Sequence, residues 1–348
     1  MRVRSIGHAC LDIQTRGPRV LTDPWWTGPA YTRQWYPWPR PAHAGVADTA
    51  YDYVYLSHGH EDHLHLDTLR TLRPGATAIV PRFAGTGGLG WLRGEGLFAD
   101  VRELAHGESL DLGGGVTATM YINVTDSMLV LDDGRHVLVD ANDALHAAPR
   151  ATRDDFTALL RARHGRVDSL YLGFGGASWF PNCIHWPGKD DRAEAMRREG
   201  ALIDNFVSIV EALEPSLACA FAASFVLLEP HLRWVVDARY AVEGPDERLR
   251  RVGRAGRTRG HLLLPGDVID GVHVTPSGDA APTVISRATP RATPRRRRWT
   301  PRACRRWWPT STRAPAPRAG PLRAPSARTR SSSRSATRRA CSSRSSAA

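Results

Sequence analysis

The feature that most restricts how this sequence can fold is the run His58-Gly59-His60-Glu61-Asp62-His63. Apolar residues at 53–56 precede it and predict a β-strand, and residues 66–72 after it predict a short helix. A loop between a strand and a helix lets alternate side chains converge on one point, whereas a regular strand or helix does not. Imidazole and carboxylate groups suit zinc, iron and manganese. The run therefore predicts a metal site rather than a polar loop with incidental histidines.

Short apolar or alternating segments dominate the first half of the chain and predict β-strands. They lie at residues 3–6, 11–14, 19–22, 53–56, 77–80, 101–104, 116–121, 128–131 and 136–139, with buried strands also expected at 170–174 and 218–221. Helical spacing of apolar residues predicts helices at 66–72, 153–163 and 192–213. Many strands with few helices imply an α/β fold in which two packed sheets are flanked by helices.

The composition of the chain changes abruptly near residue 286. From residue 287 to the end there are 18 Arg and no Lys, Asp or Glu. The preceding part holds 29 basic and 35 acidic residues, so the net charge of +12 belongs wholly to the tail. Such a tail cannot bury enough apolar surface to offset its ordering entropy. We predict a folded domain over residues 1–285 and a disordered tail, rich in Arg, Ser, Pro and Ala, over 286–348.

Three interpretations of this tail are open. It is a tail without a specific role, an arm whose Arg and Trp residues bind RNA or DNA, or the product of a shifted reading frame. The part before it has a single Lys, Lys189, against many Arg, which suggests a GC-rich gene. A shifted frame in such a gene yields Arg, Pro, Ala and Ser. We favour this interpretation and expect nucleic acid as a partner only if the tail is genuine and functional.

The remaining composition indicates a cytoplasmic protein with a small-molecule substrate and no membrane partner. No stretch reaches the roughly 20 apolar residues of a membrane span, and the first residues lack the apolar core of a signal peptide. The five cysteines are scattered without a Cys-x-x-Cys pair, which fits reduced thiols. The oligomeric state is left open.

The six-residue run resembles the His-x-His-x-Asp-His motif of the metallo-β-lactamase superfamily. The segments Ile6-Gly7-His8-Ala9 and Val20-Leu21-Thr22-Asp23-Pro24-Trp25 resemble the opening strands of the branch that contains the ascorbate-6-phosphate lactonases. The resemblance implies a four-layer αββα sandwich with metal ions at one edge of the sheets. It also implies a hydrolase with one or two divalent ions, zinc first, with iron or manganese as alternatives.

The resemblance further implies a set of ligands. One metal ion would be bound by the first two histidines of the run and a second ion by its last two residues, that is, by His58 and His60 and by Asp62 and His63. The bridging carboxylate of the family is assigned to Asp143, with Asp140 as the alternative. Asp62 or Asp143 would act as the catalytic residue that orients the attacking hydroxide and manages its proton.

Two ligand positions of the family are not matched by histidine. A further His is expected between the run and the bridging Asp, and His106 and His136 lie in that interval but not at the expected position. Asp126 or Asn123 is expected to substitute for it. A final His is expected near the C-terminal strands, where His231 lies a few residues beyond the expected position. A single metal ion, or a weakened site, is therefore also compatible with the sequence.

Four further residues are candidates for the site. His8 lines the site and contacts a metal or ligand, or is a structural His at a strand turn. Asp23 orients a metal-binding His as an outer carboxylate, or forms a turn with the Pro that follows it. Ser178 and His185, which lie in and after a Gly-rich segment, are candidates for contact with substrate.

An aromatic segment near the N-terminus is too rich in Pro for a helix. It predicts a loop that covers the metal edge as a lid, or an interface patch. Its aromatic residues are Trp25, Trp26, Tyr31, Trp35, Tyr36 and Trp38.

A second resemblance is to the CMP-N-acetylneuraminate hydroxylase group. It rests on residues 172–183, on Asn142-Asp143 and on Leu264-Pro265-Gly266-Asp267. Proteins of that group carry a metallo-β-lactamase-like region beside a Rieske iron–sulfur domain. This sequence lacks the pair of Cys-x-His and Cys-x-x-His motifs that such a cluster needs. We therefore expect that it is not a complete oxygenase of that kind.

The expected activity is metal-dependent hydrolysis of an ester, lactone, amide or phosphodiester bond by a metal-bound hydroxide. The second resemblance favours a carbohydrate-derived substrate. Three alternatives remain: an iron-dependent redox enzyme on the same fold, a nucleic-acid-binding protein that acts through the Arg-rich tail, and a fold whose degraded ligand set no longer catalyses a reaction.

Overall fold

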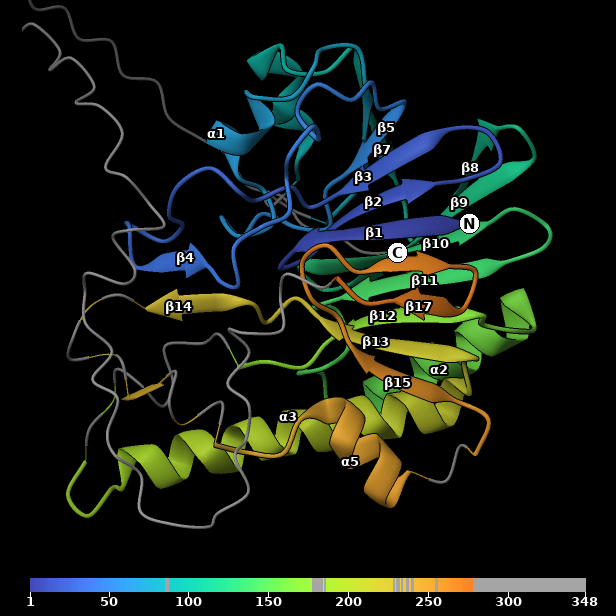
Figure 1. Cartoon of the computed structure of the whole chain (residues 1–348). Helices are drawn as coiled ribbons and strands as arrows, with labels where there is room; N and C mark the ends of the chain where they lie inside the picture. The colour runs from blue at the N-terminus through green and yellow to red at the C-terminus, as the bar shows by residue number, and fades with distance from the viewer. Residues whose placement is uncertain are drawn as a thin grey trace, which may run out of the picture. The chain divides into compact units, whose positions relative to one another are not determined.

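Two β-sheets lie face to face in the part of the chain that the structure describes (Figure 1). The computed structural model describes residues 1–84, 88–176, 184, 186–227, 229, 232, 234–235, 238, 241–253 and 256–277. All of them lie within one compact unit, Met1–Trp307. The tail 286–348 and the candidates Ser178, His185 and His231 lie outside the described residues, so the statements made about them stay predictions.

The first sheet, within the described residues, has eight strands in the order β17-β16-β1-β2-β3-β5-β6-β7. Their bounds are β1 Arg2–Gly7, β2 Cys10–Gln14, β3 Arg19–Thr22, β5 Tyr53–Tyr55, β6 Thr77–Pro81, β7 Asp100–Leu104, β16 Val268–Asp270 and β17 His273–Thr275. Strands β3, β5, β6 and β7 run parallel to one another. The carboxyl ends of β3 and β5 therefore meet at one edge of the sheet.

The second sheet has seven described strands in the order β15-β13-β12-β11-β10-β9-β8. Their bounds are β8 Ser109–Gly113, β9 Val116–Asn123, β10 Asp126–Asp132, β11 Val137–Asn142, β12 Ser169–Gly173, β13 Leu217–Phe221 and β15 Arg259–Leu262. Strands β8 to β11 form an antiparallel meander, and β11, β12, β13 and β15 are parallel. Residues 133–136 form the turn that joins β10 to β11 in a hairpin.

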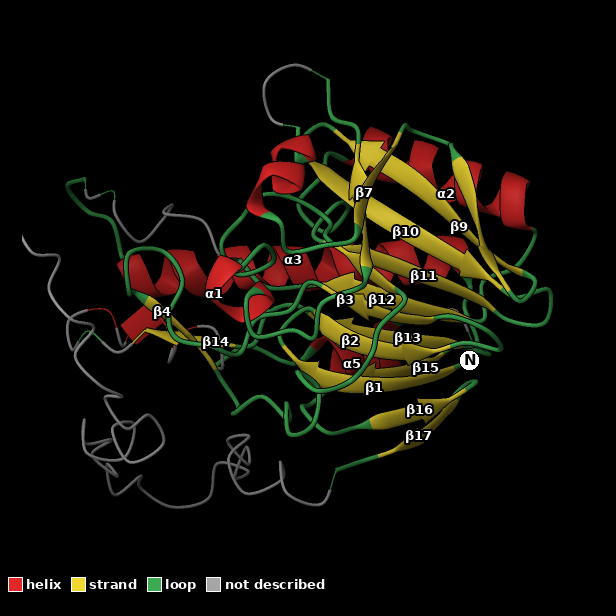
Figure 2. Cartoon of the chain, turned by 90° about the horizontal axis from the view of Figure 1, so that it is seen from above, coloured by secondary structure: helices red, strands yellow, loops and turns green. Residues whose placement is uncertain are grey.

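Helices cover both outer faces of the sheets (Figure 2). Helices α2 (Arg150–His164), α3 (Asp191–Leu213) and α5 (Pro245–Val252) pack on the second sheet. The short helix α1 (Leu66–Leu69) and the 3-10 helix η1 (Gly90–Glu95) pack on the first. This is the four-layer α/β sandwich that was predicted.

Three hydrophobic clusters hold the layers together. Alternate residues of a strand face opposite sides of its sheet, so each sheet contributes to two clusters. Tyr55 and Leu129 lie in the cluster between the sheets. Val139 and Phe206 belong to the cluster under α2 and α3, and Leu56 belongs to the one under α1 and η1.

The helices and strands predicted from periodicity are present, and their ends differ from the prediction by no more than three residues. The expectation of a plain loop in the aromatic segment is wrong in part. Strand β4 (Trp35–Pro37) pairs there with β14 (Phe225–Leu227) in a separate two-stranded ribbon. Strands of three residues are too short to show an alternating pattern. None of the described helices is both long and apolar enough to cross a membrane.

Replacing Phe206 by Ala should lower the free energy of unfolding by about 3–5 kcal/mol, as expected for a large side chain removed from a core. Phe206 is fully buried between α3 and the second sheet. Denaturant unfolding followed by circular dichroism measures the change. The control is Leu159→Ala on α2, where the side chain is 38% exposed and the change should stay near 0.5 kcal/mol, about the limit for surface positions. Equal losses in both variants would contradict the placement of α3.

Candidate metal centre

The predicted site residues converge where the carboxyl ends of β3, β5 and β11 meet. The loop 58–63 follows β5, Asp23 follows β3, and Asp143 follows β11. Asp126 begins β10, and His8 lies in the turn between β1 and β2. Both sheets therefore contribute to one group of side chains.

A buried carboxylate, Asp23, joins these segments. Its oxygens accept hydrogen bonds from the Ser57 backbone N–H at 2.8 Å and from the Ser57 hydroxyl at 2.6 Å. Nδ1 of His63 lies 2.8 Å from Oδ2 of Asp23, and the side-chain amide of Asn142 donates to the same oxygen. Asp23 thus contacts the histidine ring on one nitrogen and turns the other, Nε2, toward the centre. This is the arrangement of an outer carboxylate that orients a metal-binding histidine.

One group of candidate ligands consists of His58, His60 and Asp126. Their ligand atoms lie within 4.8 Å of one another. Nε2 of His58 is 2.8 Å from Nδ1 of His60 and 3.6 Å from Oδ1 of Asp126. A carboxylate therefore lies beside the first two histidines of the run, where the family resemblance had led us to expect a third histidine.

The other residues considered for that position lie elsewhere. The side-chain amide of Asn123 donates to the carbonyl of Ala144 at 2.6 Å. Nδ1 of His106 is 3.1 Å from backbone atoms of Ile122. Nε2 of His136 lies 2.9 Å from the Ser169 hydroxyl. The structure therefore brings Asp126, and neither of these histidines, to the metal edge.

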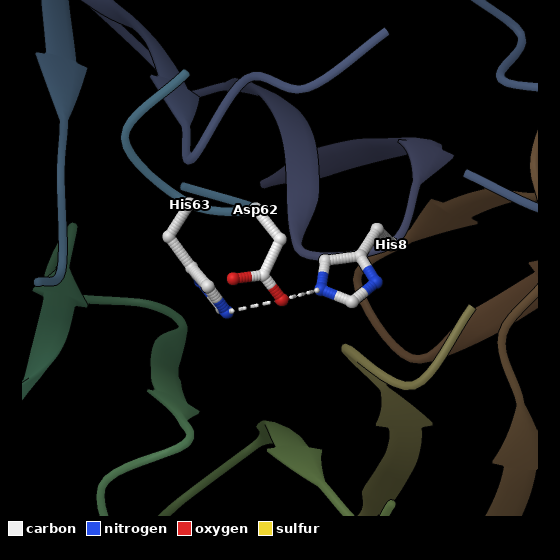
Figure 3. A group of neighbouring side chains, drawn as sticks. All are labelled: His8, Asp62 and His63. Carbon is white, nitrogen blue, oxygen red and sulfur yellow. Dashed lines mark hydrogen bonds and ion pairs between the residues drawn. The ribbon is translucent and has the colours of Figure 1, made fainter. Parts of the chain in front are cut away.

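A second group forms around His63. Its Nε2 is 3.5 Å from Oδ2 of Asp143 and 3.7 Å from Oδ2 of Asp62. Nε2 of His8 lies 3.0 Å from the same Asp62 oxygen (Figure 3). His8, Asp62 and His63 form one possible ligand triplet, and His58, His63 and Asp143 form another. His63 belongs to both and lies at the middle of the centre.

The two candidates for the bridging carboxylate have different surroundings. Asp140 lies on β11 opposite Leu129 and Tyr171, both of which face the core between the sheets. It is buried, and burial together with the nearby Asp23 raises its pKa. Asp143 lies beyond the strand end beside His63. The geometry favours Asp143 as the ligand.

His8 occupies the side of the centre where the C-terminal strands arrive. The backbone N–H of Ala222, just after β13, donates to the carbonyl of His8 at 3.2 Å. Residues 222–224, where a final histidine was expected, carry no imidazole. His8 is 4% exposed, and its Nδ1 has no hydrogen-bond partner among the described residues. Among the described residues, His8 therefore supplies an imidazole on the side of the centre where the final histidine was expected.

Two residues near Asp143 were missed by sequence reasoning. His146 lies three residues after Asp143, and its Nδ1 is 4.0 Å from Oδ1 of that carboxylate. The Asp-x-x-His spacing could have drawn attention to it. Gly173 ends β12, and a Cβ there would lie 2.9 Å from Oδ1 of Asp143. No sequence signal distinguishes this Gly from the others.

The donor atoms fit a divalent metal ion. The buried atoms that lack a hydrogen-bond partner among the described residues include four at this centre: Nε2 of His63, Oδ1 of Asp126, Oδ1 of Asp143 and Nδ1 of His146. A buried polar atom without a partner costs about 1–3 kcal/mol, and a cation would supply the missing interaction. Nitrogen and carboxylate oxygen ligands suit zinc, manganese or iron.

The charges of the centre also prepare it for a cation. Burial is the main cause that lowers the pKa of His58, and the charge of the neighbouring His63 lowers it further. The His58 ring is therefore neutral and can accept a metal ion. Burial alone would raise the pKa of Asp143, but the hydrogen bond and the charge of His63 outweigh it and lower the pKa. Burial likewise raises the pKa of Asp62, but the neighbouring His63 and His8 outweigh burial, so the pKa is lowered. These carboxylates are therefore ionised.

The first part of the chain, which contributes most of these side chains, matches a family model. Residues 2–127 match the family described as "Beta-lactamase superfamily domain". The match includes the loop 58–63, His8, Asp23 and Asp126. Residues 2–127 therefore match a superfamily domain of the kind that the histidine motif indicated, and the two packed sheets with outer helices have the corresponding fold.

Particular relatives extend the similarity beyond this domain. A Mycobacterium tuberculosis protein named as a Rieske 2Fe-2S iron-sulfur protein is 28% identical over 287 residues, which cover 78% of this chain and 54% of the relative. Cytidine monophosphate-N-acetylneuraminic acid hydroxylase of Danio rerio is 28% identical over 283 residues, 76% of this chain and 45% of the relative. The chain thus spans about half the length of these curated relatives.

Solved structures share the fold. CmlA, a diiron beta-hydroxylase from Streptomyces venezuelae, superposes with a TM-score of 0.50 and 22% identity, over 76% of this chain and 53% of that one. A possible metal-dependent hydrolase from Veillonella parvula gives a TM-score of 0.52 and 13% identity, over 77% of this chain and 98% of that one. At these identities the likeness concerns the fold alone.

Replacing Gly173 by Ala should weaken metal binding. The added Cβ would lie 2.9 Å from the Asn142 carbonyl and from Oδ1 of Asp143, and 3.1 Å from Nδ1 of His146, so the carboxylate must move. We expect a loss of about tenfold or more in zinc affinity, the lower end of the effect of displacing a partner of a ligand. Competition with a chromophoric chelator measures it.

The matched control is Gly200→Ala inside α3, where an added Cβ meets nothing within 4 Å. It should leave zinc affinity unchanged and raise stability by up to about 1 kcal/mol through helix propensity. Equal zinc affinity in the Gly173 variant and the unaltered protein would show that Asp143 is not a ligand.

Proposed function

We propose that this protein is a metal-dependent hydrolase whose centre holds one or two divalent ions. The observation that carries the proposal is the convergence of the loop 58–63 with Asp126 and Asp143, with buried donor atoms left without hydrogen-bond partners. When bound, a divalent ion would lower the pKa of a coordinated water toward neutrality. The chain supplies the donor atoms and a partly enclosed site.

Access to the centre is from one side. His60 is exposed, and the side chains of Asp126 and Asp143 are 26% and 21% exposed. His8, Asp62 and His63 are buried behind them. A substrate would therefore approach over His60, Asp126 and Asp143. Asp143 is ionised and reachable, so it is the residue best placed to accept a proton from the attacking water.

A second candidate function is iron-dependent oxidation. Asp126 beside His58 and His60 gives the centre a third carboxylate, and a carboxylate-rich nitrogen and oxygen set suits iron and manganese as well as zinc. The names of the relatives, an iron-sulfur protein and a hydroxylase, point in the same direction. We rank it second because hydrolysis needs only the donor atoms and open face described above, whereas oxidation also needs a source of electrons.

The substrate is proposed to be a small molecule. The similarity to a hydroxylase that acts on a nucleotide-linked sugar acid favours a carbohydrate-derived compound. Nucleic-acid binding by the Arg-rich tail remains a separate proposal, which depends on residues outside the described structure.

Elemental analysis of the purified full chain should find one or two equivalents of zinc or manganese, and the double variant His58→Ala/His60→Ala should lose most of this metal.

Hydrolysis of lactones, esters and phosphodiesters is then measured, and Asp143→Ala should lower kcat/KM about 100-fold or more. The control is His106→Ala, whose exposed ring lies outside the centre. Iron in place of zinc would put oxidation first. A well-folded chain without metal would contradict both functions.

A further inference from the structure

Tyr31, which lies outside the metal motif, contacts the candidate ligand Asp62 directly. The phenol O–H of Tyr31 donates to Oδ1 of Asp62 at 2.6 Å. Such a short hydrogen bond to a carboxylate is charge-assisted and stronger than a neutral one. The other oxygen of Asp62, Oδ2, faces His8 at 3.0 Å and His63 at 3.7 Å. The two oxygens of this carboxylate therefore have separate partners.

The backbone that delivers Tyr31 is strained. Three consecutive residues other than Gly, Tyr31, Thr32 and Arg33, have φ angles of 50°, 56° and 67°. The left-handed conformation costs roughly 1–2 kcal/mol for each such residue. Strain of this kind persists only where the surrounding structure enforces it, and it clusters at functional sites.

The ribbon of β4 and β14 enforces the turn (Figure 1). Backbone hydrogen bonds of 3.0 and 3.2 Å join Ala30 to Trp35 across the turn. The Trp35 ring stacks on Phe225 of β14, with centroids 3.8 Å apart and planes at 3°. The Tyr31 and Trp35 rings make an edge-to-face contact with their centroids 4.7 Å apart. Two segments about 190 residues apart in sequence are thus packed together behind this one phenol.

We propose that Tyr31 is a positioning residue that makes Asp62 a one-oxygen ligand. The phenol holds Oδ1 by a hydrogen bond and so keeps Oδ2 turned toward His8 and His63, where a metal ion would bind. A carboxylate that binds through one oxygen instead of two leaves a coordination position free for water or substrate. The proposal rests on the proposed function only in requiring that the centre binds metal.

Tyr31→Phe tests the proposal because it removes the hydroxyl and keeps the ring. The probe is Co²⁺, whose visible absorption reports ligand number and geometry, titrated into the full chain. We expect one class of Co²⁺ site to weaken 10–100-fold, the usual effect of removing a hydrogen-bonding partner of a metal ligand, and its visible spectrum to change. The control is Tyr51→Phe, a buried phenol that packs against Arg19 and should leave affinity and spectrum unchanged.

The outcomes that would overturn the Tyr31 proposal differ from the one that would contradict the hydrolase function. The same Co²⁺ affinities and spectrum in Tyr31→Phe as in the unaltered protein would overturn the proposal. A uniform loss of Co²⁺ binding with a lowered melting temperature in Tyr31→Phe would also overturn it, because Tyr31 would then be only structural. The proposal would likewise be overturned if the unaltered protein bound no Co²⁺. A protein that binds Co²⁺ as expected but hydrolyses no substrate would contradict the hydrolase function alone, and the Tyr31 comparison would still stand.

Discussion

The carboxylate of Asp23 is the interaction on which the rest of the centre depends. It is fully buried, and a buried carboxylate is tolerated only when hydrogen bonds or charges compensate for the loss of water. Ser57, His63 and Asn142 supply that compensation. Because the Ser57 hydroxyl also lies 2.9 Å from Nδ1 of His58, and Asn142 directly precedes Asp143, one carboxylate orders candidate ligands from both sheets.

Some of this arrangement could be predicted from the sequence because it is local. The run His58 to His63 follows a buried strand and holds closely spaced ligand atoms in a loop, and an outer role for Asp23 was one of the two roles that the sequence left open. The difference between Asp143 and Asp140 also depends only on their positions relative to β11. Asp140 falls on the strand face that packs between the sheets, whereas Asp143 lies beyond the strand end.

Other parts could not be predicted because they depend on contacts between distant segments. Whether His8 reaches Asp62 depends on a turn next to residue 222, far along the chain. Tyr31 lies in a Pro-rich segment whose strand partner, β14, has only three residues and no readable pattern. Gly173 matters through the space that it leaves, and a sequence shows which residue is present but not what lies around it.

The convergence of far-separated segments would also link a bound metal ion to the stability of the folded protein. His8 and Asp143 are 135 residues apart, so an unfolded chain cannot present the two together. An ion that binds only the folded chain stabilises it by mass action, by about 2.7 kcal/mol when free metal exceeds its dissociation constant a hundredfold. Scarcity of the ion that the centre is proposed to bind would therefore lower the stability of the folded chain as well as the occupancy of the centre.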